Sequence, residues 1–303
     1  MGDHIPMLSR RSFIATLATG TLASIVAGSY AIAIEPRLRL VVTRYAPKPP
    51  NWTAGRLRVA ALADLHACEP WMPVSRIEEI VAATNALAPD VVVLLGDFVA
   101  SIRHRLLTGV VTPDEWGRAL RGLSAPLGVH AVLGNHDWWT GAAEVRRGLA
   151  DNGIALLEND VTLLQPSGGQ SVWLAGLADQ LAYQFSRRRG RKGADDLPGT
   201  LAKIPDDGRP IVLLAHEPDI FPKVPSRVSL TLAGHTHGGQ VDLPLIGRPI
   251  VPSRYGDRYA YGHVIEDSRH LIVSGGLGCT GLPIRIGVPP EIVLIDIGGS
   301  PTA

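Results

Sequence analysis

The stretch "SRIEEIVAATNALAPDVVVLLGD", residues 75–97, decides the fold class of this chain. Its first half predicts a helix, because apolar residues recur on one helical face until Pro89 ends the pattern. Ser75 and Glu78 have the spacing of a capping box at its start. The second half is a β-branched run that ends in Asp97 and is typical of a buried strand. A helix followed directly by a buried strand indicates an α/β unit.

The same alternation extends to both sides of this stretch. An apolar run at 57–66 predicts a strand before the helix, and 112–123 and 129–137 predict another helix and another strand. This order favours parallel pairing in a buried sheet. From about residue 154 the apolar runs become shorter and turn residues multiply, which indicates further strands. We therefore predict an α/β (α+β) fold, in which two packed sheets flanked by helices would account for both halves within one domain.

Composition restricts the possible classes of protein. The chain has 303 residues, of which 46% are hydrophobic and 19% charged, so a large buried core is feasible. The net charge of +1 gives no reason to expect nucleic acid as a partner. Cys68 and Cys279 are the only cysteines, and the sequence does not decide whether they form a disulfide. Since no CxxC spacing occurs, nitrogen and oxygen atoms would have to hold any metal ion.

The N-terminus predicts export. Arg10 and Arg11 precede an uncharged run over 12–34, which resembles a bacterial twin-arginine signal. "AIA" at 31–33 suits a cleavage site, but the run is also long enough to cross a bilayer uncut. We therefore expect a signal or membrane anchor at 1–35 and an extracytoplasmic, periplasmic or membrane-anchored protein. The proline-rich segment 36–54 is interpreted as a linker, and 55–300 as the functional domain.

Metal-ligand residue types gather where the predicted strands end. Five strand ends carry them: Asp64 and His66, Asp97, Asn135 with His136 and Asp137, His216, and His235 with His237. Open α/β sheets bind ligands at the carboxyl ends of their strands. Residues two apart on an extended terminus point to the same face, so each pair can reach one centre. Polar residues satisfied within the core are the alternative interpretation.

The ordered motifs D-x-H, GD, GNHD, H and GHTH resemble those of the calcineurin-like metallophosphoesterase superfamily. With the leader and "GLGCTGLPIRIGVPPEI", they are most similar to its exported, YkuE-like branch. The resemblance implies a four-layer αββα sandwich of two mixed β-sheets flanked by helices, and it also implies two metal ions. Asp64, His66 and His237 would hold one, Asn135, His216 and His235 the other, and Asp97 would bridge them through its two oxygens. His136 would protonate or stabilise the leaving group, and Asp137 would orient His136 or cap the following helix.

The resemblance also bears on the identity of the metals. Purple acid phosphatases place a tyrosine three residues after the bridging aspartate, where this chain has Ala100. This difference argues against a tyrosine-bound ferric ion. Two divalent ions are expected, and Mn²⁺ suits a mixed nitrogen and oxygen site best, with Fe²⁺ and Zn²⁺ as alternatives.

The expected function is a dinuclear metal-dependent phosphoesterase. It would hydrolyse a phosphomonoester, phosphodiester or pyrophosphate by attack of a metal-bridging hydroxide, on a phosphorylated small molecule or lipid. The alternatives are a lipid-pathway pyrophosphatase acting on a UDP-linked acyl sugar and a non-catalytic metal-binding scaffold. The N-terminal segment makes membrane association possible. No substrate-binding residue is assigned from the sequence.

Three further features leave alternatives open. Trp71, Trp138 and Trp139 flank the first and third motifs and either pack under loops or wall a substrate pocket. The basic stretch 186–193 is either a solvated loop or a patch for anionic lipid or phosphate. Arg285 either contacts a phosphate or forms a structural ion pair.

Overall fold

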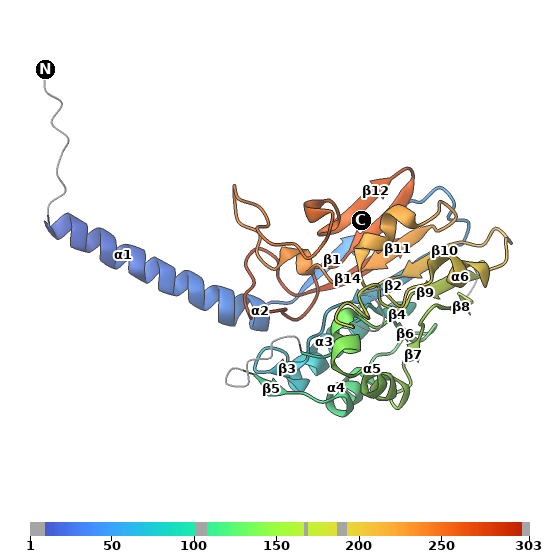
Figure 1. Cartoon of the computed structure of the whole chain (residues 1–303), viewed down its shortest axis with the longest axis horizontal. Helices are drawn as coiled ribbons and strands as arrows, with labels where there is room; N and C mark the ends of the chain where they lie inside the picture. Colours follow the sequence, from blue (N-terminus) through green and yellow to red (C-terminus); the bar gives the residue numbers. More distant parts are fainter. Residues whose placement is uncertain (1–9, 101–107, 167–168, 187–192, 299–303) are drawn as a thin grey trace, which may run out of the picture.

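Two six-stranded sheets form the centre of the molecule (Figure 1). The computed structural model describes residues 10–100, 108–166, 169–186 and 193–298. The first sheet has the order β1 (Val41–Tyr45), β14 (Glu291–Ile297), β2 (Leu57–Leu62), β4 (Val91–Leu94), β6 (Val129–Ala131), β7 (Ala155–Leu156). The second has the order β12 (Gly262–Glu266), β13 (Arg269–Val273), β11 (Leu230–Ala233), β10 (Ile211–Leu214), β9 (Val172–Gly176), β8 (Asp160–Leu164). Both sheets are mixed. In the first, β14 pairs antiparallel with β2, and in the second, β12 pairs antiparallel with β13 and β8 with β9.

Helices cover the outer face of each sheet. On the first sheet lie α3 (Val74–Ala86), α4 (Pro113–Leu120) and α5 (Asn135–Ala150), whose buried residues form one core with β2, β4 and β6. On the second lie α6 (Leu197–Ala202) and the 3₁₀ helices η2 (Pro218–Lys223) and η4 (Gly256–Tyr259). A further core fills the space between the sheets, with Leu57, Val93, Leu214 and Leu232 among its members. The predicted four-layer αββα sandwich is confirmed.

The two helix starts predicted from sequence have different outcomes. Thr112 caps α4 as expected, and its side chain and Glu115 form a capping box. The capping box expected at Ser75 and Glu78 is wrong, because α3 already begins at Val74. Pro73 occupies the N-cap position there, with φ fixed by its ring and no side-chain cap.

A strand lies within the segment expected to be a linker. β1 pairs in parallel with β14, with Val41 opposite Glu291 and Tyr45 opposite Ile295. Its residues alternate between exposed and half-buried, as is typical of an edge strand with one solvated face. The interpretation of all of 36–54 as a linker is therefore corrected, because the first sheet begins inside it.

The N-terminal segment projects from this body (Figure 1). It consists of α1 (Arg10–Ser29), one π-helical turn, η1 (Tyr30–Ile34), and α2 (Glu35–Leu38). The stretch Ile14–Leu38 has a mean hydropathy of 1.6 over its most apolar window, only 6% of which is buried. By length and composition it can cross a membrane.

Candidate metal centre

The metal-ligand side chains predicted from the sequence come together at one edge of both sheets. Asp64, His66, Asp97 and Asn135 follow β2, β4 and β6 of the first sheet, and His216, His235 and His237 follow β10 and β11 of the second. They form two adjacent groups. Asp64, His66 and His237 make one, and Asp97, His216 and His235 the other, with all ligand atoms of each group within 4.8 Å of one another. Either group can hold a metal ion.

The Asp97 carboxylate lies between the two groups. Its Oδ2 is 3.5 Å from Nε2 of His66 in one group and 3.2 Å from Nε2 of His216 in the other. Its Oδ1 accepts a hydrogen bond from the backbone N–H of His136 at 2.8 Å. A single oxygen therefore faces both groups, whereas we expected each carboxylate oxygen to serve one metal ion.

Asn135 adds an amide oxygen to the second group. Its Oδ1 is 2.9 Å from Nδ1 of His235 and 3.2 Å from Nε2 of His216. Asn135 is the first residue of α5, so the helix start fixes its position. The second group is thus Asp97, Asn135, His216 and His235, the nitrogen and oxygen set that suits divalent transition metals.

Hydrogen bonds fix the ring nitrogens that face the centre. His66 Nδ1 lies 2.9 Å from the carbonyl oxygen of Val99, and His216 Nδ1 lies 2.6 Å from that of Leu95. A carbonyl only accepts, so each Nδ1 donates and the Nε2 of a neutral ring presents its lone pair inward. Metal-binding histidines are usually oriented by such a bond from their other nitrogen.

Burial keeps most of these imidazoles neutral. It lowers the pKa of His66 to about 4 and also lowers the pKa of His235 and of His237. At His216 burial acts in the same direction, but the Asp97 carboxylate outweighs it and raises the pKa. Burial raises the pKa of Asp64 to about 7. Buried carboxylates among neutral imidazoles attract positive charge, so the donor set fits divalent cations.

The backbone at the centre adopts unusual dihedral angles. Five of the seven ligand candidates have left-handed φ: Asp64 at 54°, His66 at 45°, Asp97 at 57°, His235 at 70° and His237 at 52°. Such values are uncommon outside glycine and cluster at functional sites. The preceding Gly96 has φ of 91°, and a Cβ there would lie 2.4 Å from the backbone nitrogen of Gly134. The loops carrying Asp97 and Asn135 can approach each other only with glycine at that position.

Asp137 holds these two loops together. Its carboxylate accepts hydrogen bonds from the backbone N–H groups of Asp97 and Phe98, both at 2.9 Å, and of Val99 at 3.2 Å. It also accepts one from Gly134 at 2.9 Å, which caps α5. Of its two expected roles, helix capping is confirmed, and positioning of the Asp97 loop is an addition.

His136 lies at the partly exposed side of the centre. Its ring stands edge-on to His66, with ring centroids 5.1 Å apart, and edge-on to Trp139 at 5.0 Å. Its position in the first turn of α5 places it beside both groups. His136 is therefore the partly exposed imidazole next to His66.

Arg285 supports the centre in a way that the sequence did not indicate. It is fully buried and donates to the backbone carbonyl oxygens of Gly275 at 2.9 Å and Val288 at 2.9 Å. Its Nη2 lies 3.3 Å from Nδ1 of His237. Neither expected alternative holds, because the guanidinium binds backbone carbonyls rather than a carboxylate and has no exposed surface for a phosphate.

Two acidic residues near the centre were missed. Asp179 and Glu217 are buried and form a third potential metal-binding group with His216. Burial, followed by the charge of Glu217, raises the pKa of Asp179 well above its usual range. A signal was present, since Asp179 follows β9 as the other acidic residues follow their strands. Glu217 follows His216 directly, so it could have been included with that motif.

The three tryptophans have different surroundings. Trp71 donates from Nε1 to the Ile32 carbonyl oxygen at 3.0 Å, away from the centre. Trp138 packs under the Arg146 guanidinium, 4.7 Å from its ring centroid. Trp139, beside His136, is the one that lies at the candidate site.

The remaining open features lie apart from the ligands. Cys68 and Cys279 are buried and are not joined in a disulfide, and burial raises the pKa of Cys68 to about 11. Residues 187–192 of the basic stretch lie outside the described residues.

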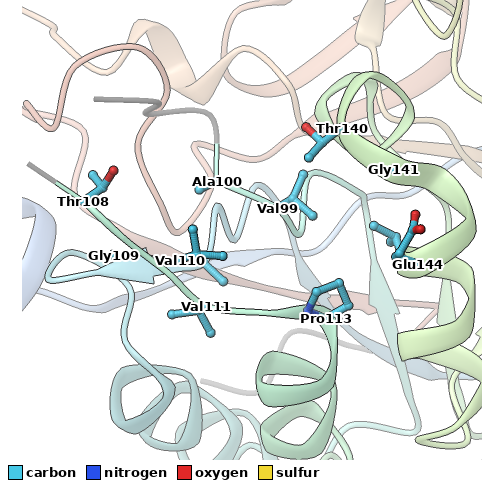
Figure 2. Close-up of a pocket in the computed structure, with 12 residues that line it drawn as sticks. Val99, Ala100, Thr108, Gly109, Val110, Val111, Pro113, Thr140, Gly141 and Glu144 are labelled. Atoms are coloured by element: carbon cyan, nitrogen blue, oxygen red, sulfur yellow. The ribbon is translucent and has the colours of Figure 1, made fainter. Parts of the chain in front are cut away.

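A pocket of about 510 Å³ lies beside the centre (Figure 2). Ala67 directly follows His66, and the carbonyl of lining residue Val99 bonds the His66 ring. The pocket is also lined by Thr140, which lies one helical turn after His136. The wall is mostly apolar: Ala67, Val99, Ala100, Val110, Val111, Pro113 and Val145 line it with Thr108, Gly109, Thr140, Gly141 and Glu144. The pocket therefore offers an apolar space next to the candidate metal centre.

The fold and the ligand groups define a metal-dependent phosphoester hydrolase, and the comparison with known families gives the same class. A family model described as calcineurin-like phosphoesterase matches residues 57–239, which include every ligand candidate. The chain belongs to this family.

Similar proteins occur in bacteria and animals. The metallophosphoesterase YkuE of Bacillus subtilis is 30% identical, with 96% of this chain and 98% of YkuE covered. Phosphodiesterase YaeI of Escherichia coli is 28% identical, with 96% and 100% covered. A transmembrane protein with metallophosphoesterase domain from Danio rerio is 30% identical, with 94% of this chain and 62% of that protein covered. The first two match over nearly their whole lengths, so the resemblance to YkuE-like relatives is confirmed.

Proposed function

We propose that the chain is a dinuclear metal-dependent phosphoesterase that hydrolyses a phosphomonoester, phosphodiester or pyrophosphate. The observation that carries this proposal is the position of Asp97 Oδ2, which faces His66 of one group and His216 of the other. Two divalent cations held there, Mn²⁺ or alternatively Fe²⁺ or Zn²⁺, would supply an activated water and neutralise charge on the phosphoryl oxygens. The name of the relative YaeI supports a diester among the three substrate types.

The protein's own residues would do the rest. One cation would be held by Asp64, His66 and His237 and the other by Asn135, His216 and His235, and Asp97 would be shared between them. His136 is partly exposed and touches His66, so its ring is placed to donate a proton to the departing oxygen. Trp139 packs edge-on against His136 and limits the orientations of that ring.

Hydrolysis of bis(p-nitrophenyl) phosphate tests this proposal. We expect activity with Mn²⁺ that a chelator abolishes, and a loss of about 10²–10⁴-fold in kcat for His136→Ala with both metal ions still bound. Asp97→Asn is expected to lose both activity and metal, measured by elemental analysis. His263→Ala and Asp160→Asn, on the edge strands β12 and β8, are the matched controls. Hydrolysis that persists in Asp97→Asn would exclude a dinuclear mechanism that depends on Asp97. Metal binding without any turnover would exclude this function and favour a scaffold.

The pocket in Figure 2 favours a second, narrower candidate, a phosphoester with an apolar chain. A UDP-linked acyl sugar is one substrate of this kind. An alkyl chain on a phosphoryl group at the centre would meet Ala67 and Val99 first. Each buried methylene contributes about 0.8 kcal/mol, or roughly fourfold in kcat/KM.

p-Nitrophenyl alkyl phosphates of increasing chain length separate the two candidates. If the substrate carries an apolar chain, kcat/KM should rise from the ethyl to the octyl ester. All esters are used below their critical micelle concentrations. Thr140→Trp, at the exposed edge of the pocket, should then abolish the rise and leave the ethyl ester unchanged. Equal kcat/KM for all chain lengths would eliminate this candidate and leave the general function standing.

We also propose that residues 1–35 direct the domain that follows them out of the cytoplasm as a twin-arginine-type signal or anchor. The paired Arg10 and Arg11 and the apolar stretch Ile14–Leu38 support this location. Fusion of the first 45 residues to a reporter active only outside the cytoplasm tests it. A cytosol-facing reporter would instead fit a lipid-pathway pyrophosphatase.

A further inference from the structure

The N-terminal segment is attached to the body at a defined place. The backbone N–H of Arg285 donates to the Ala31 carbonyl oxygen at 3.0 Å, and Trp71 Nε1 donates to that of Ile32 at 3.0 Å. Ala31, Glu35 and Pro36 are buried, whereas the apolar side chains along α1 are exposed. Residues 31–36 therefore belong to the folded body, and α1 projects from it (Figure 1).

The length of α1 matches a bilayer. Arg10–Ser29 has 20 residues, which at 1.5 Å per residue span about 30 Å, the thickness of a hydrocarbon core. At its far end lies the aromatic Tyr30, whose hydroxyl accepts from the exposed Arg39 at 3.0 Å. Trp71 bonds the backbone two residues further on, at Ile32. Aromatic residues and arginines are typical of membrane interfaces.

Exposed apolar side chains occur on the two loops that adjoin this exit. Leu245, Ile246, Ile250 and Leu282 are 108%, 71%, 75% and 64% exposed, and we call these four the collar. Their two loops are joined, since the backbone of Asp242 donates to the Ile286 carbonyl oxygen at 2.8 Å, one residue from the Arg285 that holds Ala31. Beyond residues 10–38, eight large apolar side chains in the described part of the chain are exposed, and half of them form the collar.

We propose that α1, residues 10–29, is retained as a membrane anchor and that the collar rests on the lipid bilayer around it. The "AIA" at 31–33 lies in a helical turn that is hydrogen-bonded to the body, whereas a protease requires an extended, accessible segment. A helix that ends at the bilayer surface brings the adjoining loops to the headgroups. There the collar side chains leave water and are stabilised by burial.

Retention is tested on the full chain expressed in a bacterium. The intact mass of the protein from washed membranes should include α1, and alkaline carbonate should not extract the protein. A chain that begins after residue 33 and is soluble would overturn the proposal.

The collar is tested in phosphatidylcholine and phosphatidylglycerol vesicles. Leu245→Cys and Leu282→Cys carry a polarity-sensitive fluorophore, and Ile265→Cys on β12, where Ile265 is 57% exposed, is the matched control. The unsubstituted chain controls for labelling of Cys68 and Cys279, which are buried.

We expect the collar labels to shift to shorter emission wavelength, to be quenched by nitroxide-labelled lipid, and to lose quenching by aqueous iodide. The label at residue 265 should do none of these. The test counts protein that floats with the vesicles. If iodide quenches either collar label there as strongly as the label at residue 265, the proposal that the collar contacts lipid is overturned. Neither test depends on catalysis, so failure here is separate from failure of the proposed phosphoesterase.

Discussion

At the scale of single residues, the groups that hold the centre are as informative as the ligands. Asp137 accepts four backbone N–H bonds and so fixes the loop of Asp97 relative to the start of α5. Arg285 does the same for the last loops of the chain through backbone carbonyls. A buried charged group with all its bonds formed rigidifies its surroundings, and loss of one partner is costly.

Asp137→Asn is expected to destabilise the protein by about 1–3 kcal/mol, because an amide N–H₂ would face backbone donors that have lost an acceptor. Urea unfolding monitored by circular dichroism measures this difference. The exposed Asp151→Asn, at the other end of α5, should change stability little. Equal stability of the two variants would contradict the positioning role.

At the scale of elements, the first sheet and its helices form the rigid support of the Asp97 loop. Trp116 of α4 is fully buried and stacks on Phe98, next to Asp97, with ring centroids 5.1 Å apart. The loop thus rests on a helix whose N-terminus is capped by Thr112. The packing of Phe98 on Trp116 therefore helps to hold Asp97 in position.

Trp116→Ala should cost about 3–5 kcal/mol of unfolding free energy through the cavity that it leaves. Because Phe98 loses its support, metal affinity should fall as well, which titration calorimetry can measure. Arg118→Ala, exposed on the same helix, serves as the control. Unchanged metal affinity in a folded Trp116→Ala protein would show that packing of Trp116 on Phe98 does not support the metal centre.

At the scale of the whole molecule, the proposed metal ligands come from both sheets. One group takes His237 from the second sheet, and the other takes Asp97 and Asn135 from the first, so neither sheet alone completes a site. Binding of metal to the folded chain must therefore stabilise the packing of one sheet on the other.

Saturation with Mn²⁺ at about 100 times its dissociation constant should add about 2.7 kcal/mol of stability. For a domain of this size that corresponds to a rise in Tm of about 5–10 °C, measured by scanning calorimetry against a chelated sample. Asp97→Asn should abolish the rise and Asp160→Asn should retain it. A Tm that does not respond to the metal in the unsubstituted chain would contradict a centre shared by the two sheets.

The sequence predicted the sandwich and the gathering of its polar strand ends, since parallel strands place their carboxyl ends at one edge. It did not predict β1, whose alternating pattern over only a few residues is indistinguishable from a linker. It also did not predict the hydrogen bonds of Arg285. Their acceptors are backbone carbonyls, whose positions depend on the paths of the loops and not on residue type. The one-oxygen position of Asp97 depends on a strained φ that follows from its neighbours in space.

The left-handed backbone at five ligand positions has a consequence for which amino acids can occur there. Aspartate, asparagine and histidine accept this conformation more readily than other non-glycine residues. Glutamate and cysteine bind the same metals well, yet lack that tolerance. The amino acids that can occupy the centre are thus limited both by the metal preference and by the backbone torsions. A library that exchanges the ligand residues should recover metal-binding variants at Asn135 more often than at Asp64, because of these two only Asp64 has left-handed φ.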